Sequence, residues 1–364
     1  MSTSMQTTTF DDSRLEDLSR QRPKAPWGRR TSKFRTAVIL GVFVPAAIVV
    51  ALWFYTDIPK PVIMVAFYLP LQVLASIVAA ISVRGTRAAA DAVIIVLAIG
   101  ATIFSIVVLV SLLWSIITKG WEAMSAAFLF QNNEYISPST PLGWGGVGHA
   151  VVGTVLIVAV SALIAVPLGV MTAVYVTEVR GRAVPYVRFF VQAMSGVPSV
   201  VAGLFILTVL ILSGVLTQSA FAGALAYAIL MLPTVARTAE EVLKLVPEEL
   251  RTGALALGST RARVVLRVVV PAAKTGIITA AILGVARVVG ETAPLLLTSL
   301  KNDRTVLNPF NDPITALPTY IFDNVAQPYP DAVIRAWGAA LVLMVIVAIL
   351  FILTRTLSAR GPRK

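Results

Sequence analysis

The longest uncharged run of this sequence covers residues 189–236 and is 48 residues long. One membrane-spanning helix needs about 20 apolar residues, so a run of this length predicts two spans. We place the turn between them near residues 213–219. The composition agrees, because 57% of the chain is apolar and 13% is charged, whereas soluble domains carry about 25% charged residues. The sequence therefore predicts an integral membrane protein.

Further apolar runs supply the remaining spans. Five of them are uncharged and cover residues 36–56, 61–83, 92–118, 147–177 and 336–354. One more, residues 275–300, contains the charged residues Arg287 and Glu291. The predicted fold is an all-α polytopic membrane protein with about eight transmembrane helices. An even number of spans places both termini on the same side.

Lysine and arginine residues concentrate on one side of this predicted topology. With the N-terminus inside, 24 of the 30 lie in the inside segments, as the positive-inside rule requires. Both termini and residues 237–274 are thus predicted to face the cytoplasm of a bacterial cell, while residues 120–146 and 301–335 face outward. Membrane topology explains the net charge of +12 better than nucleic-acid binding does.

The flanking segments have simpler interpretations. Residues 1–35 are polar, basic and without hydrophobic periodicity, which predicts a disordered cytoplasmic tail, and residues 357–364 form a second tail. Residues 36–91 are two extra helices, and residues 92–147 hold the first core helix with its outward loop. In the last outward loop, residues 314–325 are apolar enough to tuck back toward the membrane, and whether they re-enter it stays open.

Several kinds of site are excluded by composition. The chain has no cysteine and one histidine, His149, so a Cys- or His-based metal site is not expected. It lacks the Gly-x-x-x-x-Gly-Lys-Ser/Thr pattern, so any P-loop hydrolysis of ATP must come from another chain. We expect no catalytic residue, no metal and no cofactor bound by this chain.

The predicted cytoplasmic loop contains a short docking helix. Pro247 fits its first position, and Glu248 and Glu249 in the first turn complement the helix dipole. Gly258 is placed to end the helix in the left-handed conformation, and Ser259 can cap the next one. An apolar stripe is predicted along one face, made of Leu250, Ala254 and Leu257.

Arg287 and Glu291 lie four residues apart and are predicted to share one helix face near the middle of a span. A charge there costs about 2.5–3.5 kcal/mol on insertion scales. We favour Arg287 facing an aqueous pathway where it meets an anionic substrate, with Glu291 holding the guanidinium. The alternative is an intramembrane salt bridge that only fixes packing. Gly290 and Pro294 should loosen the helix there.

Three other features have competing interpretations. Arg188 is explained by positive-inside anchoring or by a place on an anion exit route. The run that starts at Ser195, residues 195–199, either lets helices approach closely or exposes backbone to a cavity. The glycine run at residues 145–149 matches a phosphate cradle weakly, and a flexible connection explains it better.

The cytoplasmic loop resembles the signature of ABC-importer permeases, in which Glu-Ala-Ala is followed by a glycine four places after the last alanine and by a terminal Ile-x-Leu-Pro. Thr252, Gly253 and Ala254 occupy the first three places, and Gly258 and Pro271 have the required spacing. Thr252 and Gly253 depart from Glu-Ala, and a mid-helix glycine weakens a helix by up to about 1 kcal/mol.

Three further segments are similar to phosphate ABC transporter permeases of the PstA type. They begin at Gly146, Ser195 and Arg287, and the last reads Arg-Val-Val-Gly-Glu-Thr-Ala-Pro-Leu-Leu. The resemblance covers about residues 92–356 and implies a type I transmembrane domain at residues 148–356. It also implies four kinds of partner: a second permease (PstC type), an ATPase dimer (PstB type) that uses ATP and magnesium, a phosphate-binding protein (PstS type), and the lipid bilayer.

The same resemblance implies that residues 247–257 are the coupling helix and that Arg287 belongs to the phosphate pathway. One alternative is an ABC importer of the same architecture for sulfate, molybdate or an amino acid. Another is a self-contained ion-coupled carrier, which should contain several intramembrane acidic residues, whereas only Glu291 is present. A signalling scaffold with vestigial transport is the third.

Overall fold

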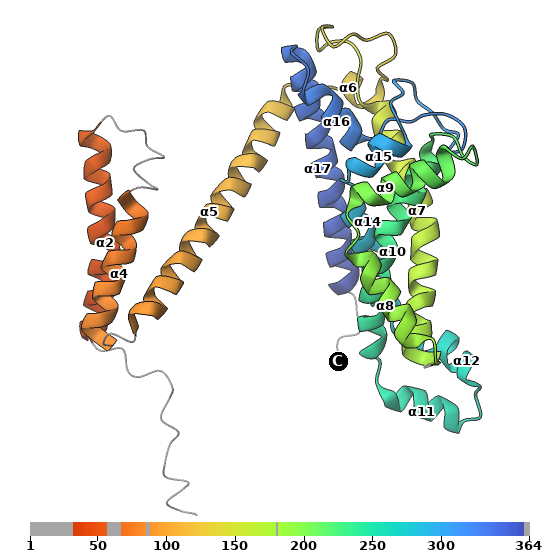
Figure 1. The fold of residues 1–364 in the computed structure, drawn as a ribbon, viewed down its shortest axis with the longest axis horizontal. Coiled ribbons are helices and arrows are strands. Elements are labelled where there is room, and N and C mark those ends of the chain that lie inside the picture. The colour runs from red at the N-terminus through yellow and green to blue at the C-terminus, as the bar shows by residue number, and fades with distance from the viewer. Residues whose placement is uncertain (1–31, 57–66, 85–87, 180, 360–364) are drawn as a thin grey trace, which may run out of the picture. The chain divides into compact units, whose positions relative to one another are not determined.

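The computed structural model describes residues 32–56, 67–84, 88–179 and 181–359, and every regular element within these ranges is a helix (Figure 1). The predicted all-α class is therefore confirmed for the described part of the chain. The chain divides into two compact units, residues 1–111 and 112–364. Each unit is described by itself.

The first unit contains two apolar helices that pack together, α2 (Ser32–Tyr55) and α4 (Leu69–Arg84). The side chain of Gln72 fastens them, because its Nε2 donates to a backbone carbonyl of α2 at 3.0 Å. α2 begins four residues before the predicted start of the first span, and the predicted tail up to residue 31 lies outside the described residues. A third helix, α5 (Ala88–Trp121), begins in this unit and ends in the second.

The second unit is organised around α10 (Ala220–Lys244), whose most apolar window is 67% buried. Alanine and glycine dominate its buried face, so neighbouring helices can approach it closely. α7, α8, α9, α14 and α15 all contact it. Other elements of this unit are α7 (Gly148–Val174) with its π-helical continuation η2 (Tyr175–Val179), η3 (Leu207–Ile211), α14 (Lys274–Val288), α15 (Ala293–Thr298) and α17 (Pro330–Ala359).

One predicted span is broken rather than straight. It consists of α8 (Val184–Ser195) and α9 (Ser199–Ile206), which continues into η3, and it bends by 102° at the break. Pro198 lies there in an extended conformation, which a continuous helix cannot contain. The predicted interruption at residues 195–199 is confirmed, and the turn expected near residues 213–219 indeed separates η3 from α10.

A second bend of 71° lies at Ala273, where the segment before α14 meets it. That segment is made of α12 (Arg261–Val264), η4 (Val265–Val269) and α13 (Val270–Ala272). Among the described residues, four helices are long and apolar enough to cross a membrane, and the two bent pairs raise the number to six. With the shorter apolar helices α2 and α4, these elements match the eight predicted spans.

The two loops that are predicted to face outward, residues 120–146 and 301–335, pack against the helices at one end of the second unit. α6 (Ala126–Phe130) and α16 (Leu317–Val325) lie at this end, and α11 (Glu248–Ala256) lies at the other (Figure 1). Residues 314–320 are buried, and the Leu317 N–H donates to Thr154 Oγ1 of α7 at 2.8 Å. The predicted inward tuck of this segment is confirmed, and its depth in a bilayer stays a prediction.

The glycine run before α7 is neither a phosphate cradle nor a flexible connection. The N–H groups of Gly146, Val147 and Gly148 donate to carbonyls of residues 128–132 at 3.2, 2.7 and 2.9 Å, so they are not free to bind a ligand. Residues 145–150 are all buried. A Cβ on Gly148 would lie 2.6 Å from a backbone carbonyl oxygen, which explains the glycine by close backbone packing.

Candidate functional site

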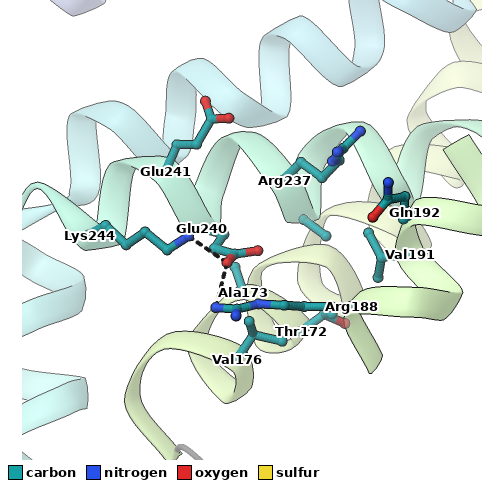
Figure 2. A pocket seen from close by; sticks show the side chains of 11 residues that line it. Thr172, Ala173, Val176, Arg188, Val191, Gln192, Arg237, Glu240, Glu241 and Lys244 are labelled. Carbon is teal, nitrogen blue, oxygen red and sulfur yellow. Dashed lines mark ion pairs between the residues drawn. The ribbon is translucent and has the colours of Figure 1, made fainter. Parts of the chain in front are cut away.

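A cavity of about 310 Å³ opens between the end of α7, α8 and the last turns of α10 (Figure 2). Its walls carry three cationic side chains and two carboxylates, together with smaller polar groups. The lining residues are Thr172, Ala173, Val176, Arg188, Val191, Gln192, Ala236, Arg237, Glu240, Glu241 and Lys244. A concave site with a surplus of positive charge is suited to a small anion.

Two of the cations share one carboxylate. Arg188 Nη2 lies 2.9 Å from Glu240 Oε1, and Lys244 Nζ lies 2.7 Å from the same oxygen (Figure 2). Half of the Arg188 side chain is exposed, whereas Glu240 is 17% exposed. Arg188 therefore lies on the cavity wall, which fits both of its predicted roles, anchoring at the membrane edge and a place on an anion route, and Glu240 offsets part of the local charge.

Arg237 is the third cation, and it makes no ion pair with any residue that the structure describes. It comes from α10, three residues before Glu240. In the sequence, Arg237 contributes only to the predicted topology, and its place in a cavity was not predicted. The signal in the sequence is that Arg237 directly follows the uncharged run 189–236 and is followed at helical spacing by Glu240, Glu241 and Lys244.

A second cavity of about 500 Å³ adjoins the first and extends to α11. The two share the lining residues Val176, Arg188 and Lys244. Glu248 and Arg251 of α11 also line the second cavity. The walls of the charged cavity and the predicted docking helix are thus joined by one hollow surface.

Arg287 lies in the last turn of α14 and turns toward α10. Its Nη1 donates to Thr234 Oγ1 at 2.8 Å, and its side chain is otherwise exposed. Thr234 and Arg237 are three residues apart on α10, so they lie on neighbouring positions of one face. Arg287 therefore lies beside the part of α10 that carries Arg237, the cavity arginine for which the described residues supply no ion pair.

Close helix packing holds Arg287 in this position. A Cβ on Gly284 of α14 would lie 2.6 Å from Val235 Cγ2 of α10, and one on Gly169 of α7 would lie 2.9 Å from the Val235 side chain. Both glycines are buried. Larger side chains at these positions would push α14 and α7 away from α10, so the small residues set the separation across which Arg287 reaches Thr234.

The prediction that Arg287 and Glu291 share one face of one helix is wrong. α14 ends at Val288, and Glu291 lies in a break of four residues before α15. The structure shows no ion pair between the two charged side chains. Instead the backbone carbonyl of Glu291 accepts a hydrogen bond from Tyr227 Oη. The expected loosening by Gly290 and Pro294 is confirmed, and it is the reason the pairing fails.

Ser195 ends α8 at the break before α9. Its Oγ donates to the carbonyl of Val191 at 3.0 Å, a bond within its own helix. Ser195 lines neither of the two cavities, although Val191 lines the first. Its predicted place in the substrate pathway is therefore not tested by the geometry.

The docking helix forms close to the predicted bounds. α11 begins one residue later than expected, because Pro247 is its N-cap in an extended conformation rather than its first helical residue. Gly258 has a φ of +80°, which confirms the left-handed end. The N-cap position of the next helix is taken by Thr260 and not by Ser259, and the Thr260 side chain makes no capping hydrogen bond.

The predicted apolar stripe of α11 is divided between two faces. Leu250 and Leu257 are 45% and 88% exposed, as is Leu255 at 41%. Ala254 instead packs against a buried cluster formed by the ends of α7 and α10 and by α12. Thr252 is exposed, and nothing lies within 4 Å of a Cβ built on Gly253. The helix therefore presents leucines and small residues outward.

Pro271, the terminal proline of the predicted signature, is exposed in α13 just before the 71° bend. A proline at the start of a short helix needs no N–H partner. The loop from α11 to α14 thus consists of a short exposed helix, a left-handed glycine and a second helical segment that bends into a span.

Comparisons with known proteins agree with this geometry. The family described as "Binding-protein-dependent transport system inner membrane component" matches residues 165–360. The phosphate transport system permease protein PstA 1 of Mycobacterium tuberculosis (strain CDC 1551 / Oshkosh) is 41% identical over 248 residues, which are 68% of this chain and 81% of the relative. The PstA protein of Haemophilus influenzae is 38% identical over 67% of this chain and 85% of its own length.

The fold is also found in solved structures. A chain of the inward-facing MetNI methionine ABC transporter has a TM-score of 0.50 with 17% sequence identity, and the match covers 60% of this chain and 96% of that one. This likeness concerns the fold alone.

Proposed function

This chain belongs to the PstA family of phosphate transport permeases, which are inner membrane components of binding-protein-dependent ABC transporters, and from that premise we propose how its residues move phosphate. It is a multi-pass permease subunit and not itself an enzyme. Its partners include an ATPase and a binding protein. We infer that these are of the PstB and PstS types, that the second permease is of the PstC type, and that ATP and magnesium are used by the ATPase.

Arg287, Arg237 and Arg188 form the anion pathway in this proposal. The observation that carries it is the bond of Arg287 to Thr234, one turn along α10 from the unpaired Arg237 in the charged cavity. Guanidinium groups bind phosphate oxygens through two parallel hydrogen bonds. The guanidinium groups of Arg287 on α14, Arg237 on α10 and Arg188 on α8 can therefore pass the anion from the break after α14 to the cavity.

Carboxylates beside the cations keep phosphate from binding too tightly. Glu240 already holds Arg188 and Lys244, so an arriving anion competes with it. Glu291, in the break after α14, adds a negative charge to those of Glu240 and Glu241, and we also place Ser195, at the break before α9, on the pathway. Competition by these carboxylates therefore helps to release the anion.

The function is tested by reconstituting this chain with its partner permease, the ATPase and the binding protein in proteoliposomes. We expect uptake of radiolabelled phosphate that requires ATP and is not inhibited by equimolar sulfate or molybdate. Equal competition by sulfate would favour an importer of another oxyanion. Phosphate uptake by the two permeases without the ATPase would favour an ion-coupled carrier.

The orientation is a second prediction. We propose that both termini and α11 face the cytoplasm, with α6 and α16 outside, because of the lysine and arginine distribution. The chain has no cysteine, so Leu257→Cys and Leu307→Cys each create a single thiol at an exposed position. In intact cells, a membrane-impermeant maleimide should label the variant at Leu307 and spare the one at Leu257. The reverse pattern would invert the topology.

A further inference from the structure

Arg251 holds the docking helix α11 to the rest of the permease. Its guanidinium is largely buried, with 13% of the side chain exposed, and it lies 3.0 Å from the carboxylate of Glu178, which is 10% exposed. Arg251 Nη2 also donates to the Leu243 carbonyl at 2.9 Å, and Nη1 donates to the Val246 carbonyl at 2.5 Å. One side chain of α11 thus contacts two other segments, η2 and the end of α10.

These segments belong to the helices that form the cavity. Glu178 lies in η2, the continuation of α7, and Leu243 ends the buried face of α10. Thr172 and Val176 on one side, and Arg237 and Glu240 on the other, line the charged cavity from the same two helices. A displacement of Arg251 therefore acts on both walls of the cavity.

Little else ties α11 down. Its leucines are exposed, there is open space around Gly253, and Ala254 makes the apolar contact with the buried cluster. An apolar contact of one alanine can slide, whereas a planar guanidinium with several bonds in different directions restricts both sliding and rotation. A second ion pair, with Glu248 at 3.2 Å, stays within α11.

We propose that the Arg251–Glu178 ion pair is a positioning pair that transmits movement of α11 to α7 and α10, and so couples the ATPase to the cavity. The inference rests on the proposed function of α11 as the coupling helix. Removing one partner of a buried pair leaves an uncompensated charge, while removing both does not. The two single neutral variants should therefore be more harmful than the double one.

The test uses the reconstituted four-component transporter with Arg251→Gln, Glu178→Gln and the double variant. We expect the ATPase to copurify with each single variant and to hydrolyse ATP, while phosphate transported per ATP falls about tenfold, which is the effect of about 1.4 kcal/mol. The double variant should recover part of the ratio, and Arg251→Lys should give an intermediate value. Arg263→Gln, in the exposed part of the same loop, is the matched control.

The outcomes separate the inference from the function on which it rests. If the unaltered transporter shows no ATP-driven phosphate uptake, the proposed function fails. If it does transport phosphate and both single variants keep the normal ratio of phosphate to ATP, the positioning role is overturned. It is also overturned if the losses of the single variants multiply in the double variant, because the residues then act independently. If a glutamine variant does not assemble, Arg251→Lys and Glu178→Asp carry the same comparison.

Discussion

Replacement of Arg287 by glutamine is expected to abolish ATP-driven phosphate uptake, while the transporter still assembles and still hydrolyses ATP. The guanidinium is exposed on the face of α14 turned to α10, and its hydrogen-bond acceptor there, the Thr234 hydroxyl, is neutral. It is therefore available to an anion. A hydrogen bond to a charged group contributes about 1.5–3 kcal/mol, so the loss of one such contact lowers the affinity roughly 10- to 150-fold.

The measurement is initial uptake of radiolabelled phosphate together with ATPase activity in the same proteoliposomes. Arg237→Gln should give a smaller loss, because Arg188 and Lys244 remain in the cavity. Arg263→Gln removes one positive charge from the loop before α14 and should leave uptake unchanged. Normal uptake by the Arg287 variant would contradict the pathway and would favour a role in helix packing alone.

The second large effect is expected from Gly258→Pro, which should detach the ATPase or uncouple it from transport. Gly258 has a φ of +80°, and its N–H donates to the Leu255 carbonyl at 2.9 Å. Proline fixes φ near −65° and has no N–H, so α11 could not end as it does. The exposed leucines of α11 would then point in other directions than in the unaltered protein.

Two quantities are measured. They are the amount of ATPase that copurifies with the permease and the phosphate transported per ATP. Gly258→Asn is the matched control, because asparagine tolerates the left-handed region, and it should retain both. Gly258→Ala should fall between them, since an alanine in that region costs about 1–2 kcal/mol. Normal copurification together with normal transport by the proline variant would remove the docking role from this loop.

Both predictions concern residues that the sequence identified, but the sequence supported them unequally. The spans followed from uncharged runs, because a bilayer about 30 Å thick imposes a length that can be counted. The end of α11 at Gly258 followed from local chemistry, since glycine alone adopts positive φ without strain. The predictions for Pro247 and Ser259 were each wrong by one position, because two neighbouring residues can both be suited to the start of a helix.

The partners of the charged residues did not follow from the sequence. Spacing suggested Glu291 for Arg287, but the helix breaks between them at residues 289–292 and Arg287 reaches Thr234, which lies 53 residues away in the chain. Arg188 pairs with Glu240, and Arg251 pairs with Glu178 across 73 residues. Spacing along one helix predicts contacts only where the helix continues.

The membrane class, the apolar runs that form the helices and the position of a punctuated docking helix followed from the sequence of this protein. These properties depend on hydrophobic length and on backbone preferences, which are local. Only the tertiary structure decided which guanidinium groups share a cavity, which one is unpaired, and that Arg251 joins α11 to α7 and α10. Those properties depend on how closely glycine and alanine let the helices approach α10, and that distance is set by packing between segments far apart in the chain.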